Sequence, residues 1–189
     1  SQELDFYSAT GSLQALTANR ISYVLGLRGP SICMDMACSS SLLSVHMARQ
    51  SILQGECDLA LAGGCNLLLS PSLSIALSKG RLMSPDGRCK TFDAGANGYV
   101  RSEGVGIIVL KRLSDALRDG NPIWGVLAAG VTNHDGYSNG LTVPNGAAQR
   151  ELLETALRQA GLSPEDVSYL ETHGTGTRLG DPVEFNASL

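Results

Sequence analysis

Two side chains in the sequence have the chemistry needed for covalent acyl transfer. Cys38 carries a thiol, whose deprotonated form is a strong nucleophile, and His173 carries an imidazole, which can donate hydrogen bonds and exchange protons near neutral pH. The two residues are 173 − 38 = 135 positions apart. A common site therefore depends on the elements that position each of them.

Cys38 follows a stretch that has the length of a buried strand. The run 30–37 is mostly apolar or small, and an amphipathic helical pattern begins directly after it and continues to about Gln54. This pattern predicts Cys38 at a strand-to-helix turn, where unpaired backbone N–H groups and the helix dipole favour the thiolate. The alternative is that Cys38 is a small buried hydrophobic residue, as free cysteines often are.

His173 is expected at the C-terminal end of another strand. The segment 167–172 predicts that strand, and it leads into the loop 173–177, His-Gly-Thr-Gly-Thr. Open α/β sheets bind their ligands at this edge. A thiol and an imidazole at one sheet edge would form an arrangement for covalent acyl transfer.

The rest of the chain predicts an α/β protein. The apolar run 57–64 predicts a strand buried on both faces and stopped by paired glycines, which completes a βαβ unit with the helix after Cys38. The polar, glycine-rich connection from 80 to 104 is long enough to suggest a functional role. Further helices are predicted at 72–79, 113–118 and from 145 to 160, and further strands at 105–110 and 123–131.

Composition excludes several classes of function. The 189 residues are 43% hydrophobic and carry a formal charge of −4 without a basic cluster, which argues against nucleic acid or an anionic membrane as the main partner. No apolar run approaches the ~20 residues of a membrane span. The five cysteines include no Cys-x-x-Cys pair and no zinc-ligand spacing, so no bound metal and no disulfide framework are expected. A cytoplasmic location fits best.

Five motifs together resemble the β-ketoacyl synthase (ketosynthase) domain of a type I modular polyketide synthase. They stand in the family's order and extend over almost the whole chain. They are Asp35–Ser41, Ser84–Asp93, Gly98–Gly104, Ser138–Gly146 and Glu171–Thr177.

The resemblance implies a thiolase-like fold with layers in α-β-α-β-α order, and a homodimer. It implies that Cys38 is the nucleophile, which accepts an acyl chain from the phosphopantetheine arm of an acyl carrier protein. His173 matches the first of the family's two active-site histidines, and Thr175 and Thr177 match positions that contact the pantetheine arm. No directly bound cofactor is implied, and the expected partners are the carrier protein, an acyltransferase and the other modules of a synthase.

The sequence also departs from the family pattern. The family's second histidine, the lysine before it and a glycine-rich segment would all lie beyond Leu189, and the family's first strands would precede Ser1. We therefore expect residues 1–189 to be the central part of one ketosynthase domain. About 1–110 would belong to its N-terminal half and about 120–189 would start its C-terminal half. Such a fragment alone is expected to be inactive.

Three alternatives remain open. One is another enzyme of the same fold, such as a thiolase or a fatty-acid-type ketosynthase. Another is a non-catalytic partner or scaffold subunit, although such proteins usually replace the nucleophile that Cys38 retains. A cysteine hydrolase is the third, and no nucleophile-elbow pattern surrounds Cys38 to support it.

Overall fold

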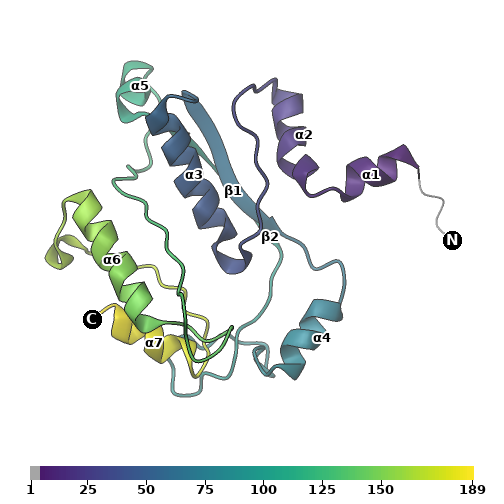
Figure 1. The fold of residues 1–189 in the computed structure, drawn as a ribbon, viewed down its shortest axis with the longest axis vertical. Coiled ribbons are helices and arrows are strands. Elements are labelled where there is room, and N and C mark those ends of the chain that lie inside the picture. The colour runs from purple at the N-terminus through teal and green to yellow at the C-terminus, as the bar shows by residue number, and fades with distance from the viewer. Residues whose placement is uncertain (1–4) are drawn as a thin grey trace. The chain divides into compact units, whose positions relative to one another are not determined.

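A computed structural model of the chain describes residues 5–189, which are drawn in colour in Figure 1. The chain divides into two compact units, one with the chain up to Gly64 and Val105–Gly125, the other with Cys65–Gly104 and Val126–Leu189. The helices are α1 (Phe6–Ser12), α2 (Ala15–Leu25), α3 (Ser40–Gln54), α4 (Ser72–Lys79), α5 (Leu113–Arg118), α6 (Gly146–Ala160) and α7 (Gly180–Ala187). Two 3-10 helices, η1 (Ala37–Ser39) and η2 (Pro164–Asp166), and a two-stranded sheet of β1 (Leu59–Asn66) and β2 (Gly104–Lys111) complete the regular structure of these residues.

Helix α3 lies against β1 in the first unit (Figure 1), and small residues allow this close contact. The hydroxyl of Ser44 donates a hydrogen bond to the carbonyl of Gly63 at 2.9 Å, which ties the helix to the strand. A Cβ atom at Gly64 would lie 2.9 Å from the Cβ of Ser41, and one at Gly63 would lie 2.0 Å from the carbonyl oxygen of Gly106 in β2. Two glycines in β1 therefore let the helix and the second strand approach their backbone.

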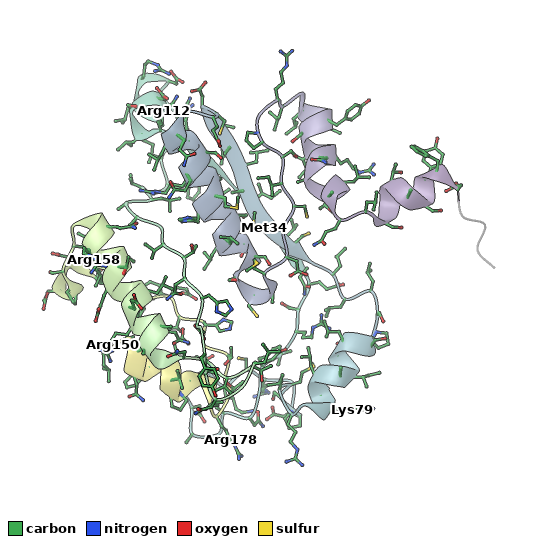
Figure 2. All side chains as sticks on the ribbon, in the orientation of Figure 1. Met34, Lys79, Arg112, Arg150, Arg158 and Arg178 are labelled. Atoms are coloured by element: carbon green, nitrogen blue, oxygen red, sulfur yellow. The ribbon has the colours of Figure 1, made fainter. Side chains whose placement is uncertain are left out.

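Arg112, labelled in Figure 2, joins three elements of the same unit. Its guanidinium donates to Asp115 at 2.8 Å in α5, to the carbonyl of Ile52 at 3.2 Å in α3, and to Asp58 just before β1. Hydrogen bonds to the two carboxylates raise the pKa of Arg112 above its ordinary value. The end of α3 is thereby held next to the start of β1.

Helices α6 and α7 lie side by side in the second unit (Figure 1). Asn145 caps α6 by accepting two backbone N–H bonds of its first turn, and Gly161 ends the helix in a left-handed conformation with φ 68°. Arg150, labelled in Figure 2, donates to the carbonyl of Asn186 at 2.5 Å. This bond fixes the C-terminal end of α7 against α6.

The helices agree with the sequence analysis, whereas several strands do not. The helix after Cys38 and the helices predicted at 72–79, 113–118 and 145–160 are confirmed, as are strands near 57–64 and at 105–110. The glycine pair lies inside β1 instead of stopping it, and β1 is mostly half-buried instead of buried on both faces. The strands predicted at 30–37, 123–131 and 167–172 are wrong. A strand is assigned only where a second strand completes a ladder of backbone hydrogen bonds, and among residues 5–189 the only such sheet is that of β1 and β2.

Few side chains of residues 5–189 are buried. The buried apolar residues are Ile52, Ala62, Ala96, Ala116 and Ala187. Several large apolar side chains are almost completely exposed, among them Trp124 and Tyr137 at 100% and 95%. Within residues 5–189, no helix has both the length and the apolar character needed to cross a membrane.

Candidate active site

Cys38 lies in η1, the single 3-10 turn that leads directly into α3, and its side chain is exposed. The turn is held by short-range hydrogen bonds. The carboxylate of Asp35 accepts from the backbone N–H of Ala37 at 2.8 Å. The hydroxyl of Ser40 accepts from the N–H of Met36 and donates to the carbonyl of Ala37, both at 2.8 Å. The predicted place of Cys38 at the start of a helix is therefore confirmed, although the segment before it has no regular secondary structure and is not a strand.

Ala37 has a left-handed backbone, with φ 52°. This conformation is unfavourable for a residue with a Cβ atom, by about 1 to 2 kcal/mol. The bonds that Asp35 and Ser40 make to this turn offset that strain. Strained backbone of this kind is frequent beside nucleophiles, because it exposes the following side chain on a tight turn.

His173 begins the loop 173–177 and is exposed. Its backbone N–H donates to one carboxylate oxygen of Glu184 at 2.5 Å, and the N–H of Gly174 donates to the other at 2.8 Å. Glu184 lies in α7, so the helix fixes the backbone of the histidine and leaves its imidazole free of this contact. This is a suitable arrangement for a group that must reach a substrate.

Thr175 and Thr177 are half-buried in the same loop. Their hydroxyl oxygens are 2.9 Å apart, within hydrogen-bond distance, and the hydroxyl of Thr177 also accepts from the N–H of Gly180 at 3.0 Å. Only one of the two hydroxyl hydrogens is needed for the bond between them. The other hydrogen is therefore available to a ligand, and the role of both residues in substrate binding stays a prediction.

The sequence analysis missed Asp181 and Glu184, whose carboxylates hold this loop. Asp181 accepts from the N–H of Gly176 at 2.9 Å, and Glu184 accepts from His173 and Gly174. The signal was present: Pro182 marks the start of a helix, and acids three residues apart share one face of it. Helical side chains lean toward the N-terminus, so these carboxylates lie over the loop that precedes α7.

Cys38 and His173 belong to different units, the first unit and the second. The structure describes each of their surroundings, and their arrangement around one substrate stays a prediction. Of the other cysteines, Cys33 and Cys57 are half-buried, whereas Cys65 and Cys89 are exposed.

Comparison with known proteins identifies the family. The sequence matches the family model "Beta-ketoacyl synthase, N-terminal domain" over residues 1–116 and "Beta-ketoacyl synthase, C-terminal domain" over residues 124–189. The first match alone covers more than half of the chain. The chain therefore belongs to the β-ketoacyl synthase family, as its five motifs predict.

Its relatives include subunits of a polyketide synthase. Over 186 residues it is 54% identical to one component of the phenolphthiocerol/phthiocerol polyketide synthase of Mycobacterium tuberculosis, and the match covers 98% of this chain and 12% of that protein. Over 185 residues it is 55% identical to another component of the same synthase, and this match covers 98% of this chain and 8% of the relative. The chain thus spans only about a tenth of the length of these proteins.

Solved structures give the fold. An oxazolomycin ketosynthase domain from Streptomyces albus superimposes with a TM-score of 0.91 at 47% identity, covering 93% of this chain and 30% of that one. The ketosynthase from module 6 of the bacillaene synthase of Bacillus subtilis gives 0.92 at 45% identity, covering 97% and 33%. The predicted thiolase-like α/β fold is confirmed, and the chain covers about a third of it.

Proposed function

We propose that this chain is the central part of a β-ketoacyl synthase that extends an acyl chain in polyketide synthesis. One observation carries the proposal: a chain that matches the family along almost its whole length presents an exposed thiol, Cys38, on the turn that opens α3. Residues of about 1–110 would belong to the N-terminal half of the ketosynthase domain, and about 120–189 would start its C-terminal half. The first family match ends at residue 116 and the second begins at residue 124, which supports this division.

The first step loads the enzyme. The sulfur of Cys38 attacks the carbonyl carbon of an acyl thioester carried on the phosphopantetheine arm of an acyl carrier protein. The bond between that carbon and the pantetheine sulfur breaks, and the proton given up by the Cys38 thiol passes to the departing pantetheine sulfur. The backbone N–H of Cys38 would donate to the oxyanion of the tetrahedral intermediate.

The second step forms the carbon–carbon bond. A malonyl-type extender on a carrier protein loses CO2, and the electron pair of the broken bond becomes an enolate. The enolate carbon attacks the acyl-Cys38 carbonyl, Cys38 leaves as a thiolate, and a β-ketoacyl thioester remains on the carrier. His173 would donate a hydrogen bond to the extender's thioester carbonyl and so stabilise the enolate. Thr175 and Thr177 would hydrogen-bond the pantetheine arm.

The proposed function also implies which partners the domain has. Substrates reach the site on the pantetheine of a carrier protein, so no cofactor need bind the chain itself. The relatives are components of polyketide synthases, which supports an acyltransferase and other modules as neighbours of this domain. A homodimer and a cytoplasmic location complete the proposed setting.

Loss of the thiol tests the first step. In the intact ketosynthase domain that contains this sequence, Cys38→Ala should abolish covalent loading from a radiolabelled acyl thioester. Cys65→Ala, which removes another exposed thiol, should load like the unchanged enzyme. Label retained by Cys38→Ala would refute the assignment, and absence of loading in the unchanged enzyme would favour a non-catalytic scaffold protein.

Loss of the imidazole tests the second step. His173→Ala should leave acyl loading of Cys38 largely intact and stop condensation with the extender. The control is His134→Ala, because His134 is also exposed and its Nδ1 accepts a hydrogen bond from the nearby N–H of Gly136 at 2.8 Å. If His173→Ala lost loading but kept condensation, the two roles would have been exchanged.

A further inference from the structure

The His173 loop is bonded to a segment far away in the sequence. The hydroxyl of Thr91 donates to the carbonyl of Gly174 at 2.5 Å, across 83 residues, and the thiol of Cys89 donates to the carbonyl of Thr175 at 3.2 Å. One more bond runs from the N–H of Gly98 to the carbonyl of Gly176 at 2.9 Å. The polar segment 89–98 therefore supports the loop from Gly174 to Gly176, one residue after the histidine.

The two loops also touch along their backbones. A Cβ atom at Gly174 would lie 2.7 Å from the Cγ2 of Thr91, and one at Gly176 would lie 3.0 Å from the backbone nitrogen of Lys90 and 3.1 Å from the Sγ of Cys89. Both glycines have positive φ, 54° and 68°. The alternate glycines of His-Gly-Thr-Gly-Thr are thus explained by close packing against 89–92 as well as by their backbone conformation.

Asp181 links the same two loops from α7. It is only 4% exposed and is the one buried charged side chain among residues 5–189. One of its oxygens accepts from the N–H of Phe92 at 2.6 Å and the other from the N–H of Gly176 at 2.9 Å. Phe92 has a left-handed backbone, φ 56°, and its ring lies edge to face with Phe185 of α7, with 6.2 Å between centroids.

We propose that Thr91 and Asp181 are positioning residues for His173. They hold the loop 173–177 against the segment 89–92, so that the imidazole stands where the extender's thioester carbonyl must bind. This inference rests on the proposed function, because it assigns His173 the stabilisation of the enolate. Neither Thr91 nor Asp181 touches the substrate in this scheme.

The geometry explains why such support would matter. Backbone groups of the loop, from the N–H of His173 to the carbonyl of Gly176, are bonded to residues outside the loop. Fixing the backbone of His173 and of the residues directly after it fixes where its imidazole can reach. A displacement of about 1 Å at a group that stabilises a transition state can lower the rate by about 100-fold.

Two substitutions at Thr91 separate the effect of its hydroxyl group from that of its shape. Thr91 is exposed, so Thr91→Val keeps the shape of the side chain and should fold in the intact ketosynthase domain. Thr91→Ser keeps the hydroxyl and tests rescue. Thr155→Val is the matched control, since it removes a hydroxyl that accepts from Arg158 at 2.9 Å within α6, away from the His173 loop. Asp181→Asn places an amide NH2 group against a backbone N–H, so that one of the two bonds is replaced by a repulsive contact. This variant should therefore have the larger effect.

The readout is condensation per acylated Cys38. Each variant is loaded with a radiolabelled acyl thioester, the acylated fraction is measured, and the rate with a malonyl thioester of carrier protein is divided by that fraction. Thr91→Val should lose about 10-fold in this kcat with unchanged loading, whereas Thr91→Ser and Thr155→Val should stay within about 2-fold of the unchanged enzyme. Asp181→Asn should lose more than Thr91→Val.

Misfolding would lower the acylated fraction but not the rate per acylated site, so it cannot imitate the expected result. Equal rates per acylated site in Thr91→Val, Asp181→Asn and the unchanged enzyme would overturn the inference, as would failure of Thr91→Ser to rescue. If the unchanged enzyme neither loads nor condenses, the proposed function fails first, which is a distinguishable outcome.

Discussion

The turn that carries Cys38 and the loop that carries His173 are stabilised over very different distances along the chain. The hydrogen bonds that the structure shows within the Cys38 turn join residues at most four positions apart, from Asp35 to Ser40. The bonds of the His173 loop reach Thr91, and Asp181 beside it reaches Phe92, across 83 and 89 residues. The backbone position of Cys38 thus depends on bonds within its own turn. The backbone position of His173 depends on two other segments of its unit.

This difference decides which substitutions should affect each residue. A local turn keeps its geometry when remote packing changes, because its bonds close within one stretch of backbone. A loop held by remote segments moves when any of them is altered. Substitutions in 89–98 or α7 should therefore disturb His173, and only substitutions within about 35–40 should disturb the Cys38 turn.

The largest expected effect on stability comes from a glycine in the His173 loop, which remote segments of the chain hold in place. Gly176→Ala would combine a positive φ of 68° with contacts near 3 Å to Lys90 and Cys89. We expect a loss of about 3 kcal/mol in the free energy of unfolding. Gly161→Ala is the control, because Gly161 has the same φ of 68° and nothing within 4 Å of the added Cβ, so it should lose only about 1 kcal/mol. Denaturant unfolding of the intact domain measures both. Equal losses would show that the contact with 89–92 is unimportant.

The same distinction explains how much of the fold the sequence predicts. Helix α3, with its C-cap Gly55 at φ 76°, and α6, between Asn145 and Gly161, are set by local patterns and were predicted well. The strands predicted at 30–37, 123–131 and 167–172 depend on a neighbouring strand, which no local pattern specifies.

The site divides in the same way. The helix start at Cys38 follows from residues next to it in the sequence, and the turn follows that pattern. The bonds that Thr91 and Asp181 make between the His173 loop and the segment 89–92 could not be derived, because hydrogen bonds across more than 80 residues leave no periodic signal. Gly174 and Gly176 were visible as glycines, but the atoms they pack against were not.

A smaller effect should follow from Asp35→Ala, which removes the bond to the N–H of Ala37. We expect a loss of about 1 kcal/mol in stability and a changed rate of alkylation of Cys38 by iodoacetamide. Asp93→Ala is matched to it, since Asp93 makes the same short-range bond to the N–H of Gly95 at 2.6 Å. The Asp93 variant should lose similar stability but leave Cys38 alkylation unchanged. An unchanged alkylation rate in Asp35→Ala would contradict a locally held nucleophile.

A gain in stability is expected from Ala37→Gly. Glycine adopts the φ of 52° at this position without steric strain, and this relief exceeds the entropy that glycine loses on folding. The net change should be a stabilisation of about 0.5 kcal/mol. Ala48→Gly within α3 should instead destabilise by about 1 kcal/mol, because no strain is relieved there. Thermal unfolding of both variants in the intact domain measures the sign of each change in stability. Destabilisation by both substitutions would show that the turn carries no strain.

The smallest effect concerns pH and the segment that supports His173. A hydrogen bond from Lys90 at 2.8 Å lowers the pKa of Asp86 from 3.8 to about 2. Since the folded chain binds this proton less readily than the unfolded chain, the pair stabilises the fold above about pH 4, and its contribution disappears as the pH falls through 2. Asp86→Asn should therefore be slightly less stable than the unchanged domain at pH 7, and the difference should shrink as the pH falls below about 4 and be lost below about pH 2. Lys90→Met, which removes the partner and leaves Asp86 in place, should raise the pKa of Asp86 toward 3.8 in an NMR titration. A difference between Asp86→Asn and the unchanged domain that stayed constant from pH 7 to about pH 2 would mean that the carboxylate supports the segment by something other than its charge.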